Sequence, residues 1–356
     1  MNKIIDVFAD IKGLKYTPLL GKKLNILNFQ LIDKALQKET AFILKINEKH
    51  IAVSWWVSPK RTRSYPYARV YDTLKLEKRA TIIPIMKDEG EGGDRDFLQW
   101  DTISLMSLLG VYVIISYYSD ASKSSRFGNK ITDQRFDIDY LRSEIEKLLY
   151  YHSDALHWNL SQIDKVGEVG QKALRSYEGI SNKLGVKMHS WESAEKRINQ
   201  LLKGKKTFMR LSRKLAEKAQ KRERVTVQPK EHLTGMKATL TIKNYLGGYY
   251  YLTCDEVEIH GQYLYLIEGK HTKTSSLPSL EDIKDGLVRM MLFTNLEDVK
   301  INAKSYNSTP ILKLTTGGEF NINSLKETQR QLFELLKKEA QKNGFKIMIN
   351  NRFIDI

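Results

Sequence analysis

Cysteine is nearly absent from this chain of 356 residues, which has only Cys254. A single cysteine excludes an intrachain disulfide and a cysteine-rich zinc site, and it favours a cytoplasmic location. Proline is also scarce, at 7 residues, whereas hydrophobic residues make up 41% of the chain. This composition is typical of a folded globular protein rather than a disordered one.

Long apolar runs are missing as well. No run approaches the ~18–20 residues needed to cross a bilayer, and the first residues lack the apolar core and small-residue cleavage site of a secretory signal. We therefore expect no membrane partner. The chain also has no P-loop and no dinucleotide-binding fingerprint, which argues against two common classes of nucleotide-binding enzyme.

Acidic residues are too few to balance the basic ones. The chain has 58 Lys and Arg against 42 Asp and Glu, a formal net charge of +16. This excess predicts a polyanionic partner, and nucleic acid is favoured over a membrane because no basic amphipathic stretch has a Trp/Phe face. The length allows two domains, each with its own core.

The stretch 249–270, YYYLTCDEVEIHGQYLYLIEGK, predicts a β-hairpin. Aromatic and β-branched residues fill both halves, and His260-Gly261 can supply the positive φ of a two-residue turn. We expect Ile259 and Gln262 to form the pair that flanks this turn.

In that register Asp255 lies opposite Leu266. Side chains alternate along a strand, so Glu268 and Lys270 point to the same face as Asp255. The diagonal from Asp255 to Glu268 is then roughly 7–8 Å at Cα, which lets both carboxylates reach one ion. Two carboxylates suit Mg²⁺, and a neighbouring lysine can hold or activate water and offset phosphate charge. A slip of one residue would put Glu256 in place of Asp255.

Asp255, followed by a hairpin and Glu268-Gly269-Lys270, resembles the signature of PD-(D/E)XK nucleases, with Cys254 where proline would stand. The resemblance covers about the last third of the chain. It implies Mg²⁺-dependent hydrolysis of double-stranded DNA, with Asp255 and Glu268 as metal ligands and with both acids and Lys270 as catalytic residues. The alternative is an exposed hairpin with ordinary surface charges.

Within that family the chain looks most like a bacterial type II restriction endonuclease. Residues 79–118 resemble segments of such enzymes, and the residues before 231 leave room for sequence recognition. Palindromic sites are usually cut by two-fold dimers, so we expect a homodimer. A structure-directed repair or recombination nuclease and a non-catalytic DNA-binding protein are the alternatives.

Two further stretches predict contact with DNA. Residues 58–72 interleave arginines with tyrosines, which suits contact with phosphate or guanine, although the tyrosines could instead cover a core edge. Residues 203–224 are strongly basic, although a charge run is often only a solvated face. The candidate DNA-contacting residues are Arg61, Arg63, Arg69, Lys205, Lys206, Arg210, Arg213, Lys214 and Lys273.

The pattern as a whole predicts a mixed α/β protein. We expect an N-terminal α/β domain over 1–150 as a DNA-recognition module, a helical basic connector over 151–230, and a nuclease domain over 231–356 with a mixed sheet flanked by helices. Capping boxes at Ser279 and Ser324 predict two helices in the last of these.

An acidic, Gly-rich loop at 87–96 is the rival metal site. Its candidate ligands miss the spacing of an EF-hand; they are Asp88, Glu89, Asp94 and Asp96. A simpler interpretation is that Asp94 or Asp96 caps a helix beginning near Phe97.

Overall fold

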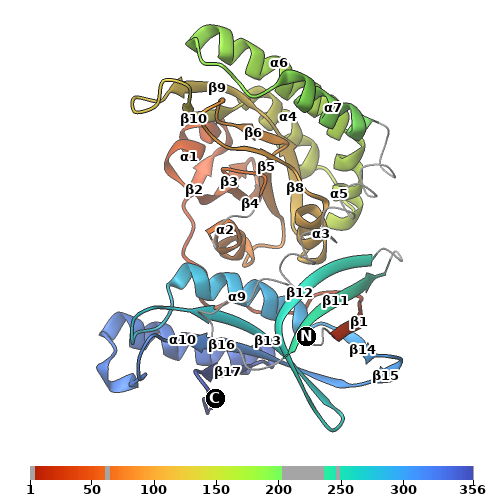
Figure 1. Ribbon diagram of the computed structural model, residues 1–356, viewed down its shortest axis with the longest axis vertical. Helices are drawn as coiled ribbons and strands as arrows, with labels where there is room; N and C mark the ends of the chain where they lie inside the picture. The colour runs from red at the N-terminus through yellow and green to blue at the C-terminus, as the bar shows by residue number, and fades with distance from the viewer. Residues whose placement is uncertain (1–4, 61–64, 203–235, 246–248, 356) are drawn as a thin grey trace. The chain divides into compact units, whose positions relative to one another are not determined.

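The computed structural model describes residues 5–60, 65–202, 236–245 and 249–355 (Figure 1). The chain is mixed α/β and divides into two compact units. Unit 1 combines 1–23, 63–75 and 216–356, and unit 2 combines 24–62 and 76–215. The domain boundaries expected at 150 and 230 do not coincide with these units. The reason is that segments far apart in sequence fold together, which local patterns do not reveal.

Unit 1 is built on a nine-stranded mixed sheet of order β15-β14-β1-β11-β12-β13-β16-β17-β18 (Figure 1). Its strands are β1 Ile5–Ile11, β11 Met236–Asn244, β12 Tyr249–His260, β13 Tyr263–His271, β14 Glu297–Ile301, β15 Lys304–Ser305, β16 Asn307–Thr315, β17 Lys346–Ile349 and β18 Arg352–Phe353. Its helices are α2 Tyr65–Thr73, α9 Leu280–Phe293, the 3-10 turn η2 Ile322–Ser324 and α10 Glu327–Asn343.

The two long helices of unit 1 begin and end for local reasons. Ser279 caps α9 by accepting a hydrogen bond from the Asp282 amide, as its capping box predicts. The capping box at Ser324 is wrong, because α10 is preceded by Lys326 and has no side-chain cap. Gly344 ends α10 in the left-handed region at φ +74°, which glycine adopts without a steric penalty.

Helix α9 leads from β13 to β14, which pairs with β1 toward the other end of the sheet, and α10 connects the parallel strands β16 and β17. Helix α9 packs on β13 and β16, and α10 packs on β17. α2 packs on α9, and the Lys284 ammonium lies 2.6 Å from Asp72, with both side chains buried. Tyr71 of α2 also donates to Glu339 of α10 at 2.7 Å. The segment that contains α2 is therefore tied to both helices.

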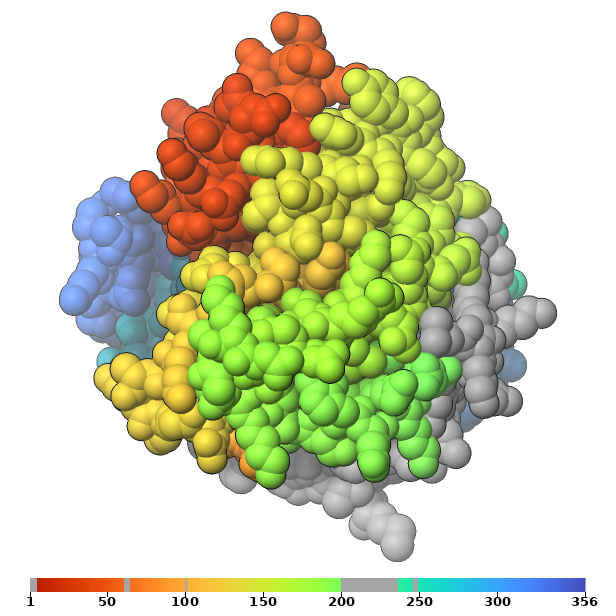
Figure 2. All heavy atoms as spheres, turned by 90° about the horizontal axis from the view of Figure 1, so that it is seen from above, coloured from red at the N-terminus to blue at the C-terminus, as the bar shows by residue number. Residues whose placement is uncertain are grey.

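Unit 2 has a five-stranded sheet of order β2-β3-β4-β5-β8 and two small hairpins, β9 with β10 and β6 with β7. Helices α6 and α7 cover the face of unit 2 that is turned toward the viewer in Figure 2. The strands are β2 Ile26–Asn28, β3 Ala41–Ile46, β4 Lys49–Trp55, β5 Arg79–Pro84, β6 Met86–Asp88, β7 Arg95–Phe97, β8 Tyr112–Ser116, β9 Tyr118–Lys123 and β10 Ile131–Phe136. The helices are η1 Phe29–Leu31, α1 Ile32–Lys38, α3 Trp100–Leu108, α4 Ile138–Leu149, α5 Ala155–Asp164, α6 Val166–Leu184 and α7 Trp191–Leu202.

Side chains of α5 satisfy the edge of the unit 2 sheet at β8. Asn159 Oδ1 accepts from the Val113 amide at 2.7 Å, and Trp158 Nε1 donates to the Val113 carbonyl at 2.7 Å. Gln162 Oε1 accepts from the Ile115 amide at 3.3 Å. An open edge otherwise invites pairing with another chain, so α5 closes the sheet.

None of the described helices is long and apolar enough to cross a membrane.

Asp120 of β9 makes the folding stability of unit 2 depend on pH. Its carboxylate pairs with Arg135, and with Lys183 at 3.0 Å. The hydrogen bond from Arg135 is the main cause that lowers the Asp120 pKa from 3.8 to about 2. A depressed carboxyl pKa stabilises the fold above the unfolded value, and this contribution is lost as the pH falls from 3.8 toward 2.

We therefore expect Asp120→Asn to lower the free energy of unfolding by less than about 1 kcal/mol at neutral pH, since the pair is partly solvated. Urea midpoints of the wild type and the variant should converge as the pH is lowered through this window. A gap between the two midpoints that stays constant or widens in acid would contradict the assignment.

Candidate active site

The hairpin of β12 and β13 turns at Gly261-Gln262. Its closing pair is His260 and Tyr263, and Gly261 has φ +64°. The expected closing pair of Ile259 and Gln262 is therefore wrong, and the register moves by two residues. Glycine at the first turn position accounts for the difference, because a positive φ is favoured there.

A shift of two residues keeps every side chain on its expected face. At the end of the hairpin away from the turn, the last paired residues of β12 and β13 are Glu256 and Ile267. Leu266 pairs with Val257, so the expected pairing of Asp255 with Leu266 is wrong. Asp255 instead contacts β13 at Gly269, whose amide donates to Asp255 Oδ2 at 2.9 Å, and Gly269 lies between Glu268 and Lys270.

A β-bulge occurs at Asp255. On β11 only Lys237 separates Met236 from Ala238, whereas Asp255 and Glu256 together occupy the corresponding positions of β12. Bulges of this kind re-aim side chains and are frequent beside active sites. The bulge therefore gives Asp255 a direction that plain strand alternation does not define.

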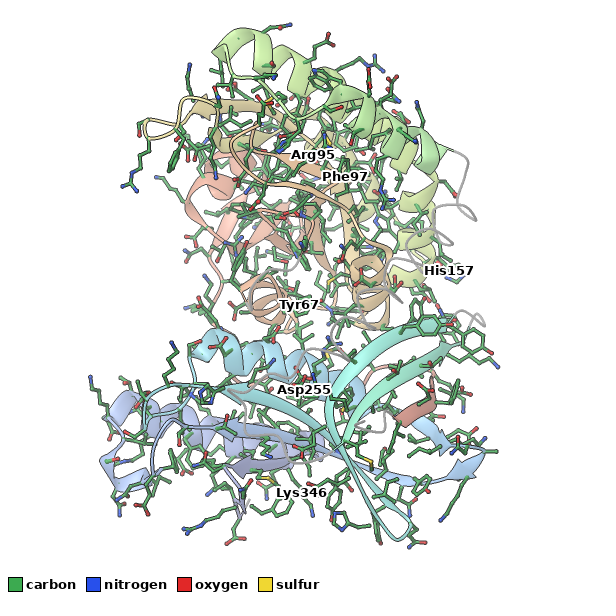
Figure 3. All side chains as sticks on the ribbon, viewed as in Figure 1. Tyr67, Arg95, Phe97, His157, Asp255 and Lys346 are labelled. Atoms are coloured by element: carbon green, nitrogen blue, oxygen red, sulfur yellow. The ribbon has the colours of Figure 1, made fainter. Side chains whose placement is uncertain are left out.

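Lys270 lies between two acids, Glu268 and Asp285. Asp255 of the same hairpin is labelled in Figure 3. The Lys270 Nζ is 2.8 Å from Glu268 Oε1 and 2.5 Å from Asp285 Oδ2 on α9. Asp255 Oδ2 accepts from the Gly269 amide at 2.9 Å. The three residues of the predicted motif and one acid from α9 thus form a single connected cluster.

Burial dominates the electrostatics of Glu268, which is 5% exposed. Burial and the nearby Asp255 carboxylate raise its pKa, while Lys270 and Arg289 oppose the increase. A buried carboxylate is costly unless it is paired or binds a cation. A positive charge placed next to Glu268 therefore stabilises its ionised form.

Asp285 and Arg289 are the site residues that sequence reasoning missed. They are one helical turn apart on α9, where every residue from Ile283 to Phe293 is buried. An acid and a base four residues apart, followed by a run of apolar residues, is the signal that could have identified them.

The donor chemistry of this cluster fits Mg²⁺. Carboxylate oxygens are the protein ligands that this ion prefers, and one or two of them suffice when water and phosphate supply the rest. No group of three or more His, Cys, Asp or Glu side chains in the described parts of the chain is arranged as a metal cage. Any ion held by Asp255 and Glu268 would therefore depend on water or substrate oxygens.

Glu256 differs from its expected role. A one-residue slip would have put it in the place of Asp255, yet it is fully buried and lies 3.2 Å from the ammonium of Lys313, which is 2% exposed. The parallel pairing of β16 with β13 explains the position of Lys313, which is paired with Gly269. The hairpin thus carries an ionic cluster on one face and a buried ion pair on the other.

The predicted DNA contacts fall in several places. Arg69 lies in α2, with its guanidinium 4.8 Å from the Tyr65 ring centre, and Lys273 is exposed just beyond β13. Tyr67 and Tyr71 of α2 are buried, so they cover core as the alternative interpretation predicted, although from a helix rather than a loop. The remaining candidates lie outside the described residues: Arg61, Arg63, Lys205, Lys206, Arg210, Arg213 and Lys214.

Three of the four candidate ligands in the loop 87–96 already have partners. Asp88 Oδ1 lies 2.7 Å from His189 Nδ1, and Glu89 is paired with both Lys87 and Lys130. Asp96 accepts from Ser58, and α3 begins after Gln99 without a side-chain cap. The capping interpretation is therefore wrong, because β6 and β7 form a hairpin that places these acids before the helix.

Gly286 controls the approach of α9 to Lys270. A Cβ at this position would lie 2.6 Å from Leu312 Cδ1 and 3.3 Å from Lys270 Cε. We expect Gly286→Ala to destabilise unit 1 by about 1–3 kcal/mol through overpacking and to displace the Lys270 side chain. Urea unfolding measures this effect.

The matched control is Gly179→Ala in α6. A Cβ there meets nothing within 4 Å, so this variant should be neutral or stabilised by about 0.5–1 kcal/mol. Equal stability of the two variants would show that Gly286 is not required for close packing.

Comparison with known proteins identifies no relative. No family model matches the chain, no curated protein matches it, and no solved structure matches it. The chemistry of the cluster therefore has to be argued from its own residues.

Proposed function

We propose that this chain is a Mg²⁺-dependent endonuclease that cuts double-stranded DNA at a specific sequence, as a type II restriction enzyme does. The observation that carries the proposal is the cluster on one face of the β12–β13 hairpin. There Asp255 accepts a hydrogen bond from the Gly269 amide at 2.9 Å, and the Lys270 ammonium is 2.8 Å from Glu268. The net charge of +16 supports a polyanionic substrate.

Each side chain has a role in this proposal. Asp255 and Glu268 hold the ion through carboxylate oxygens. When bound, Mg²⁺ polarises the scissile phosphate and eases ionisation of a water molecule. Lys270 donates hydrogen bonds from its ammonium to the attacking water or to a phosphate oxygen, and its charge offsets the negative charge that builds up there. In-line attack of this kind leaves 5′-phosphate and 3′-hydroxyl ends.

The surroundings of Lys270 support a catalytic role rather than that of an ordinary surface lysine. The Lys270 side chain is only 11% exposed. A buried ammonium is held in one position by its two acids, and a fixed donor is what transition-state stabilisation requires. Homodimerisation and a cytoplasmic location belong to the proposal as the usual setting of such an enzyme.

The test is incubation of the purified chain with supercoiled plasmid DNA, in Mg²⁺ or in EDTA. We expect discrete linear fragments with Mg²⁺ and intact plasmid with EDTA. Cleavage of flaps or junctions alone would indicate a structure-directed nuclease instead. DNA binding without cleavage under any divalent ion would indicate a non-catalytic DNA-binding protein.

A further inference from the structure

Arg289 is a buried base whose hydrogen bonding is incomplete. The residue is 8% exposed, and its Nη1 has no hydrogen-bond partner among the described residues. A buried N–H without a partner is costly, so each such group calls for an explanation. Guanidinium groups pair best with planar or tetrahedral oxyanions, carboxylate and phosphate above all.

The groups around Arg289 show where its charge acts. Its pKa is raised by Glu268, Tyr67, Asp285 and Asp255, against the opposing effect of burial. Arg289 lies one helical turn beyond Asp285 on α9, and Asp285 Oδ2 is 2.5 Å from the Lys270 ammonium. Residues four apart share a helix face, so Arg289 lies on the side of α9 that contacts the cluster.

The formal charges of the cluster leave a negative excess. It contains three carboxylates, from Asp255, Glu268 and Asp285, and two bases, Lys270 and Arg289. With all five groups ionised the net charge is minus one, which repels a DNA phosphate. Adding one divalent cation makes the net charge plus one, which a single phosphodiester then neutralises.

We propose that Arg289 is a phosphate-binding residue, and that its charge makes DNA binding at this site depend on prior binding of a divalent cation. This inference rests on the proposed nuclease function and names a residue that the nuclease signature does not contain. The phosphate enters beside Asp255, which is only partly buried, and it takes up the unused N–H of Arg289. Without Arg289, the cation-loaded cluster has no net positive charge left for the phosphate.

The test measures DNA affinity rather than cleavage. Fluorescence anisotropy of a labelled mixed-sequence duplex is recorded at constant ionic strength, in Ca²⁺ or in EDTA. Ca²⁺ is the probe because it takes the same oxygen ligands as Mg²⁺. For the wild type we expect Ca²⁺ to tighten binding at least about fivefold, at the lower end of ordinary coupling between two ligands.

Three variants separate charge from folding. Arg289→Met should abolish the gain from Ca²⁺, whereas Arg289→Lys, which keeps the charge, should retain most of it. Asp285→Asn makes the cluster neutral without a cation, so its DNA binding in EDTA should exceed that of the wild type. Misfolding cannot produce these opposite changes, and melting temperatures confirm that each variant is folded.

Two results would overturn the inference. One is an Arg289→Met variant that is folded and keeps the full Ca²⁺ enhancement. The other is an Asp285→Asn variant that binds DNA in EDTA no more tightly than the wild type. If the wild type itself shows neither Ca²⁺ enhancement nor Mg²⁺-dependent cleavage, the proposed function fails as well. If the wild type cleaves plasmid while the variants show no charge dependence, only the role of Arg289 is lost.

Discussion

Lys270→Ala should reduce cleavage by about 10²–10⁴-fold, the usual contribution of a positioned proton donor or acceptor, and this loss should exceed any loss of DNA affinity. The reason is geometric, because the Lys270 ammonium is held within hydrogen-bond distance of both Glu268 and Asp285. Initial rates of plasmid cleavage and a parallel DNA-binding titration measure the two effects separately.

Controls distinguish chemistry from a structural ion pair. Lys270→Arg keeps a positive charge between Glu268 and Asp285, so it should restore stability if the alanine variant loses any. It should not restore cleavage, because a planar guanidinium places its donors differently. Lys342→Ala changes an exposed lysine of α10 and should shift stability by no more than about 0.5 kcal/mol. Wild-type cleavage by Lys270→Ala would remove Lys270 from the mechanism.

Lys313→Met should be the most destabilising single change described here, with a loss of about 3–5 kcal/mol. Lys313 is 2% exposed, and its partner Glu256 is fully buried. Removing one partner of a buried ion pair leaves an uncompensated charge in a low-dielectric environment, which accounts for the size of the effect. Chemical denaturation followed by far-UV circular dichroism measures the loss.

The double variant Glu256→Leu with Lys313→Met is the informative comparison. Replacing both partners by apolar side chains of similar volume is often neutral or stabilising, so most of the lost stability should return. A double variant that is less stable than Lys313→Met would mean that Glu256 makes a further contact more important than this pair.

Local patterns predicted most of the elements near the site. Alternation along β13 places Glu268 and Lys270 on one face, and the two-residue change in register does not alter this because two is the period of a strand. The Ser279 capping box located the start of α9 for the same local reason. The resemblance to PD-(D/E)XK nucleases remains a prediction about function.

Other features depend on packing between segments that are distant in sequence. Asp285 joins Lys270 only because α9 packs against β13 and β16, in an orientation that the helix's own pattern does not specify. The insertion of β1 beside β11 and of α2 beside α9 likewise joins residues more than two hundred positions apart.

The amino-acid sequence by itself therefore determined the central hairpin, the shared face of Glu268 and Lys270, and the basic charge. All of these follow from interactions between near neighbours or from composition. The tertiary structure decided that Asp285 and Arg289 join the cluster, that Glu256 is buried against Lys313, and that unit 1 is assembled from separate segments. These outcomes depend on how whole elements pack, because the free energy of burying a charge is set by its partners in space and not by its neighbours in the chain.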